Sequence, residues 1–99
     1  MSGTLVIIPP MGAVRTLRYE GRQWSLEQVQ SLCEGYIERV QVRWDGRIRD
    51  AYVDEDGVAH QAPYNERATL ALSERWQGQQ IVGTAVVIVP DSKAKKDTA

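Results

Sequence analysis

The chain has 99 residues, 42% hydrophobic and 25% charged, and its 12 basic and 13 acidic residues give a net charge of −1. This near-average composition excludes a disordered or membrane-spanning chain, and the length allows one domain. A basic excess, which drives phosphate binding, is missing, so we do not expect a nucleic-acid partner. The apolar runs are far shorter than the ~20 residues that span a bilayer, so we expect no membrane partner. Because the lone Cys33 cannot form an intramolecular disulfide, we expect a soluble protein in the reducing cytoplasm.

Two strands are expected at the start of the chain. Residues 4–8 are apolar and mostly β-branched, and Gly3 and Pro9-Pro10 bound them, which predicts a buried strand. A second strand is expected over residues 13–20, ended by Gly21.

The following helix has complete start and stop signals. Ser25 is the expected N-cap, and Gln28 completes a capping box. Trp24 and Val29 have the spacing of a hydrophobic staple, and Gly35 is expected as the left-handed C-cap residue.

A hairpin and a helix are predicted next, before a final strand. Polar and apolar residues alternate over residues 36–44, Asp45-Gly46 favours a tight turn, and a return strand runs over residues 48–53. A second helix is expected from an Asn65 N-cap to Gly78, and then a strand over residues 81–89.

The order β-β-α-β-β-α-β predicts an α+β domain over residues 1–90, followed by a flexible polar tail at 91–99. We expect two helices packed on one face of a mixed five-stranded sheet. The first and last strands are the most apolar, so they are expected to lie side by side at its centre.

Four short sequence blocks within residues 35–89 carry a resemblance to a known family, because they occur in the same order and at the same spacing as in that family. They are Gly35-Tyr36-Ile37 with Val40, Tyr52-Val53-Asp54-Glu55 with Gly57, Asn65 with Ala68-Thr69, and Ile81 with Gly83. In these blocks residues 35–89 resemble the domain-of-unknown-function family 3846, small proteins of bacteria and their phages. The sequence departs from the family where Cys33-Glu34 stand in place of a second small residue. The resemblance implies a phage or mobile-element context and brings no established activity, so it assigns no catalytic residue.

An acidic block follows the predicted hairpin. Asp54, Glu55 and Asp56 could hold a hard divalent cation, which prefers carboxylate oxygens. Adjacent side chains on a strand end point in alternate directions, however, and Asp-Gly chemistry suits a solvated turn. We therefore expect a turn with no metal, and treat these acids as one pole of a binding surface.

Arginines concentrate on the hairpin. Arg39, Arg43, Arg47 and Arg49 are expected to form an Arg-rich sheet face, with Arg15 and Arg18 on the second strand as possible extensions. Since arginine is favoured at interfaces, this face could bind a host protein; it could also be a structural lattice of cross-strand ion pairs. The third interpretation is a face that binds RNA or a phosphate-bearing ligand, although few aromatic residues lie among these arginines.

His60 and Cys33 are the only residues suited to nucleophilic catalysis. A Cys-His dyad is conceivable, but Cys33 falls on the apolar stripe of the first helix, which predicts a buried position. His60 is expected to be an exposed loop residue without partners, and Asn65 a helix cap. Trp24, Trp44 and Trp76 are expected in core or staple positions.

These patterns predict a small non-enzymatic accessory protein without a cofactor that binds a host macromolecule. The predicted contacts are Arg39, Arg43, Arg47 and Arg49, with Asp54, Glu55 and Asp56 as the opposite pole. The alternative is a protein that binds a phosphate-bearing small molecule such as a nucleotide. A homodimer through an exposed edge strand is compatible with either.

Overall fold

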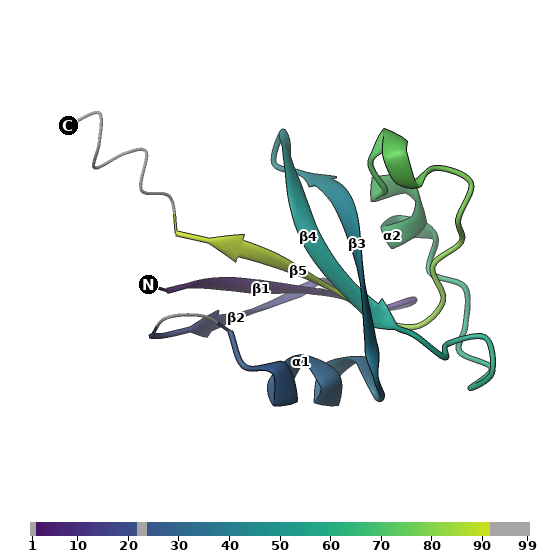
Figure 1. Ribbon diagram of the computed structural model, residues 1–99, viewed down its shortest axis with the longest axis horizontal. Coiled ribbons are helices and arrows are strands. Elements are labelled where there is room, and N and C mark those ends of the chain that lie inside the picture. The colour runs from purple at the N-terminus through teal and green to yellow at the C-terminus, as the bar shows by residue number, and fades with distance from the viewer. Residues whose placement is uncertain (1, 22–23, 92–99) are drawn as a thin grey trace.

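Five strands, two α-helices and one 3₁₀ turn make up the computed structural model, which describes residues 2–21 and 24–91 (Figure 1). In chain order they are β1 (Gly3–Ile8), β2 (Arg15–Tyr19), α1 (Leu26–Cys33), β3 (Ile37–Trp44), β4 (Arg47–Asp54), α2 (Glu66–Ala71), η1 (Glu74–Trp76) and β5 (Ala85–Pro90). The predicted order of strands and helices is confirmed. Apart from Asp91, the predicted tail lies outside the described residues.

The sheet has the order β2-β1-β5-β4-β3, and every neighbouring pair is antiparallel. The expectation of a mixed sheet is therefore wrong. β1 and β4 run in the same direction, but β5 lies between them and runs the other way, so no parallel pair forms. The predicted pairing of the first and last strands is confirmed, with register from Gly3↔Pro90 to Ile8↔Ala85.

The two helices cover opposite faces of the sheet, and not the same face as expected. On one face Val29 of α1 packs with Val86 of β5, and on the other Ala68 of α2 packs with Val87. The physical reason is that β1 and β5 are apolar at consecutive positions. Side chains alternate between the faces of a strand, so both faces must be covered. The three tryptophans are partly buried against these two cores.

Helix α1 begins as predicted and ends one residue earlier. The Ser25 side chain accepts a hydrogen bond from the Gln28 N–H at 3.2 Å, which confirms the N-cap. The left-handed residue at the C-terminus is Glu34, with φ of 66°, and not Gly35. The N–H of Gly35 donates to the Gln30 carbonyl oxygen at 3.1 Å.

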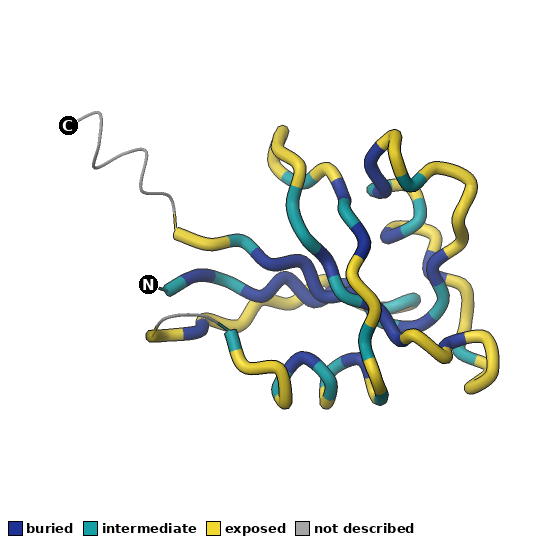
Figure 2. The backbone as a smooth tube through the Cα atoms, in the orientation of Figure 1, coloured by how far each residue is buried: buried dark blue, intermediate teal, exposed yellow. Residues whose placement is uncertain are grey.

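The β3–β4 hairpin turns at Asp45-Gly46 as predicted, both with positive φ. β4 pairs with β5 only at Ala51 and Tyr52. The rest of the hairpin therefore projects away from β1, β2 and β5, and its turn is exposed (Figures 1 and 2).

Helix α2 is shorter than predicted. It ends at Ala71, and the next residue, Leu72, forms an antiparallel bridge with Val42, while the N–H of Ser73 donates to the Gln41 carbonyl oxygen at 3.0 Å. This pairing along the outer edge of β3 replaces further helical turns, and only η1 follows. The predicted N-cap of α2, Asn65, is confirmed. Asn65 is fully buried, and its Oδ1 accepts a hydrogen bond from the Ala68 N–H at 3.1 Å.

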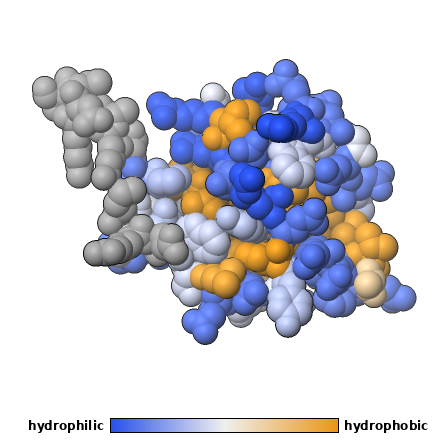
Figure 3. All heavy atoms as spheres, viewed as in Figure 1, coloured by the Kyte–Doolittle hydropathy of each residue, from blue (hydrophilic) through white to orange (hydrophobic). Residues whose placement is uncertain are grey.

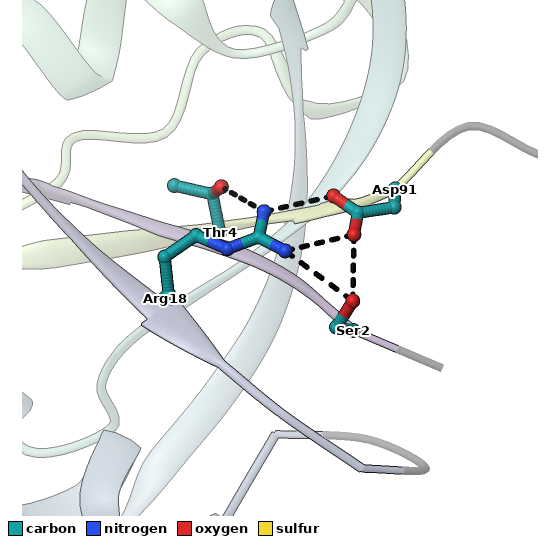
Figure 4. A network of polar contacts seen from close by, with 4 residues as sticks. All are labelled: Ser2, Thr4, Arg18 and Asp91. Carbon is teal, nitrogen blue, oxygen red and sulfur yellow. Dashed lines mark hydrogen bonds and ion pairs between the residues drawn. The ribbon is translucent and has the colours of Figure 1, made fainter.

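Arg18 joins three strand ends (Figure 4). Its guanidinium donates to both carboxylate oxygens of Asp91, each at 2.8 Å, and makes longer contacts at 3.3 Å with Thr4 and Ser2. The Ser2 hydroxyl also donates to Asp91, at 2.6 Å. This arginine of β2 therefore connects the residue after β5 to β1, and does not extend the arginines of the hairpin.

The surface in the view of Figure 3 is mainly hydrophilic, interrupted by separate hydrophobic patches. Within the described ranges, no helix is both long enough and apolar enough to cross a membrane.

Candidate functional site

Two depressions flank His60. The first, with a volume of about 530 Å³, lies between the end of α1, residues 60–63 and Gly83-Thr84. The second, of about 670 Å³, is shallower and runs along α1 to Tyr36. Both include Glu34 and His60, so His60 stands on the wall between them. Among the described residues, neither depression is lined by a lysine or an arginine.

Asp54 and His60 form the main polar contact of this wall. The Asp54 side chain is only 4% exposed, and its Oδ2 lies 2.7 Å from His60 Nδ1. Its other oxygen accepts from the Asp56 N–H at 2.8 Å. Since the carboxylate is an acceptor, Nδ1 donates and Nε2 is the ring nitrogen left to bind something else. The hydrogen bond and the charge of Asp54 raise the pKa of His60 above its ordinary 6.5.

This contact is the part of the site that sequence reasoning missed. His60 is exposed as predicted, but the expectation that it has no partner is wrong. Five residues of irregular loop lie between it and Asp54, and this segment follows no regular helix or strand from which the contact could be read. The sequence signal for the turn is the Asp-x-x-Gly pattern of residues 54–57, in which the Asp54 carboxylate accepts a hydrogen bond from the Asp56 N–H.

Gly35 makes room for the pair. A Cβ atom at Gly35 would lie 3.2 Å from Asp54 Oδ1 and 3.4 Å from His60 Cε1. The contact with Asp54 is tighter than most real Cβ contacts, so a larger residue would press on the carboxylate that holds His60. The glycine assigned to the helix cap thus serves the site instead.

Cys33 lines the first depression but is not an activated nucleophile. It is 3% exposed, and its Sγ donates to the Tyr52 carbonyl oxygen at 3.5 Å. Burial, together with the smaller effect of the charges of Asp54 and Glu34, raises the pKa of the thiol to about 12. A thiol that stays protonated at neutral pH is a poor nucleophile. The predicted buried position is confirmed.

The four hairpin arginines do not share one face. Arg43 lies opposite Ile48 in the β3–β4 register, whereas Arg47 lies opposite Trp44 and Arg49 opposite Val42. Opposed residues lie on the same face of a sheet. Arg39 and Arg43 therefore point to the face of α1, and Arg47 and Arg49 to the face of α2. The Arg-rich face expected from the sequence is split between the two sides of the hairpin.

The arginines also differ in their partners. Arg39 forms an ion pair with Asp50 at 3.2 Å, and Arg43 forms one with Glu74 at 2.7 Å, all with exposed side chains. Arg39 thus forms a cross-strand ion pair of the expected kind, whereas the partner of Arg43 lies in η1. Arg47 is exposed, and the Nε of half-buried Arg49 has no hydrogen-bond partner in the described chain.

The acidic pole lies at the other end of β4 from the hairpin turn. Asp54 is turned inward toward His60, while Glu55 and Asp56 are exposed. Asp56 lines the second depression together with His60. In the described part of the chain, no three His, Cys, Asp or Glu side chains are placed to hold a metal ion. The structure therefore brings Asp54 and His60 together and keeps the acids apart from the arginines.

Comparison with known proteins gives one match. The searches of curated proteins and of solved structures found no match. The family model of a domain of unknown function, DUF3846, matches residues 3–99, which adds β1, β2 and α1 to the blocks that carried the resemblance. The chain therefore belongs to the DUF3846 family.

Proposed function

We propose that this chain is a non-enzymatic accessory protein of a phage or mobile element that binds an acidic surface of a host protein. The contact surface is the tip of the β3–β4 hairpin, which comprises Arg43, Arg47, Ile48 and Arg49. The observation that carries the proposal is that β4 extends four residues beyond its last pair with β5, and those residues include Arg47, Arg49 and an Ile48 that is 45% exposed.

The distribution of charge supports a protein partner. Residues 43–49 hold three arginines and one aspartate, a local charge of +2 in a chain of net charge −1. Glu55 and Asp56 lie beyond the opposite end of β4. The strand rises roughly 23 Å over the seven steps from Arg47 to Asp54. Such segregation steers association and fixes the orientation of a partner. Arginine beside an exposed aliphatic residue is also the composition of many protein interfaces.

A binding role is favoured over an enzymatic one by the state of Cys33. The Asp54–His60 pair could accept a proton, but the thiol beside it has a pKa of about 12 and its hydrogen is bonded to a main-chain carbonyl. The pair is therefore interpreted as a support for the loop between the two depressions.

Site-specific photo-crosslinking tests the proposal. A benzophenone amino acid replaces Ile48 in one variant and Leu70, 76% exposed on α2, in the matched control. In lysate of the host cell, we expect Ile48 alone to crosslink to one polypeptide, and Arg47→Glu to remove that product. Equal crosslinking from both positions, or a product that survives Arg47→Glu, would exclude the hairpin tip. A saturable thermal shift with ATP that Arg47→Glu abolishes would instead favour the phosphate-bearing ligand.

A further inference from the structure

The two sides of the hairpin differ in how their main-chain edges are covered. Along β3, Leu72 and Ser73 pair with Val42 and Gln41. On the other side, residues 47–50 of β4 have no neighbouring strand within 2–21 and 24–91, because β5 pairs only at Ala51 and Tyr52. An open strand edge presents a row of N–H and C=O groups that another extended chain can pair with. The open edge lies on the side of β4 that faces away from β3 (Figure 1).

We propose that this edge binds its partner by strand addition, and that the added segment is acidic. The inference rests on the proposed function and names the chemistry of the partner. Arg47 and Arg49 point to one face of the sheet, and Ile48 between them points to the other. A strand laid beside them places every second residue next to an arginine and the residue between next to Ile48. The complementary segment therefore alternates Asp or Glu with an apolar residue.

The same geometry disfavours the other occupants. A second copy paired antiparallel through this edge would set arginine opposite arginine, which is destabilising. A nucleic-acid strand carries charge complementary to the arginines, but its backbone has no alternating N–H and C=O groups to satisfy the edge. An extended acidic peptide satisfies both the main chain and the side chains.

Fluorescence anisotropy with synthetic peptides tests the inference. The probe is a labelled nine-residue peptide of alternating glutamate and valine, and its control has the same composition in two blocks. We expect saturable binding of the alternating peptide and at least tenfold weaker binding of the blocked one. Two further peptides carry N-methyl groups on every second residue, one at the odd-numbered positions and the other at the even-numbered positions. We expect one phase to lose binding, since its N–H groups face β4, and the other to retain it.

Variants locate the site. Arg47→Glu, alone and with Arg49→Glu, is expected to weaken binding at least tenfold; the single variant is included because Arg49 is half-buried. Arg15→Glu on the exposed edge strand β2 is the matched control, expected to change affinity less than twofold. An unchanged affinity for Arg47→Glu, or a loss confined to Arg15→Glu, would overturn the assignment to β4.

The outcomes separate this inference from the proposed function. If both N-methylated peptides bind as tightly as the parent while Arg47→Glu still weakens binding, strand addition is wrong and an acidic partner at the hairpin tip stands. If the peptides do not bind but Ile48 crosslinks to a polypeptide in an Arg47-dependent way, the partner is not an extended segment. If neither experiment implicates Arg47, both proposals fail.

Discussion

His60 Nδ1 lies 2.7 Å from Asp54 Oδ2, and this contact ties the middle of the 55–62 loop to the end of β4. Asp54 is buried and His60 is half-exposed, so the imidazole can exchange protons with solvent while its partner stays fixed. The pair therefore couples the stability of this loop to pH.

The stability of the protein is expected to fall as the pH rises through the pKa of His60. Asp54 raises this pKa in the folded state above the ordinary 6.5, so folding favours the protonated imidazole. The stabilisation is complete below pH 6.5 and is lost as the pH rises through the folded-state pKa. The difference in unfolding free energy between the wild type and His60→Gln, from urea denaturation, should shrink over the range in which the pH rises from 6.5 through the folded-state pKa. A difference that is constant across this range would contradict the coupling.

The same pair can be followed directly. His60 is the single histidine, so its ring resonances in a proton NMR titration need no assignment. We expect a midpoint above 6.5 in the wild type and a lower one in Asp54→Asn, which keeps the shape but removes the charge. Equal midpoints would mean that the carboxylate does not act on the imidazole.

Local chemistry explains which parts of the fold were predictable. The turn at Asp45-Gly46 and the cap at Ser25 depend on residues within three positions of one another in the chain, and both predictions are confirmed. The end of α2 depends instead on Leu72 pairing with Val42, thirty residues away in the chain, and the helical pattern through Trp76 gives no sign of it.

Two further errors could have been avoided from the sequence. A two-residue turn at Asp45-Gly46 sets Trp44 opposite Arg47, and continuing that register separates Arg47 from Arg43. Consecutive apolar residues at 86–88 likewise imply that both faces of the strand are buried, and hence that the helices lie on opposite sides. The contact between Asp54 and His60 is different, since it depends on the path of an irregular loop.

Cys33 is expected to be unreactive in the folded protein. With a pKa of about 12, roughly one thiol in 10⁴ is ionised at pH 8, against about a quarter for an ordinary thiol. The reaction with Ellman's reagent should therefore be at least ~100-fold slower in buffer than in denaturing urea. As Cys33 is the single cysteine, the absorbance change reports this residue alone. Comparable rates in both conditions would mean that the thiol is accessible in the native state.

Asn65 is expected to be the most costly single polar substitution in the second half of the chain. Its Oδ1 caps α2 at the Ala68 N–H, and its Nδ2 donates to the carbonyl oxygens of Ile8 and Gly83, both at 2.8 Å. Because the residue is fully buried, water cannot replace these bonds. Asn65→Ala removes the cap and also the donor to both carbonyl oxygens, so we expect a loss of about 2–4 kcal/mol of unfolding free energy.

The matched control for Asn65 is Ser25→Ala at the start of α1. Ser25 makes the same kind of cap bond, to Gln28, but is exposed and has no second role. Its loss should cost about 0.5–1 kcal/mol. Urea denaturation of both variants separates the cap from the two carbonyl bonds, since only Asn65 joins the end of β1 to the segment before β5. If the two variants lost equal stability, Ile8 and Gly83 would have found other donors, and Asn65 would act as a cap alone.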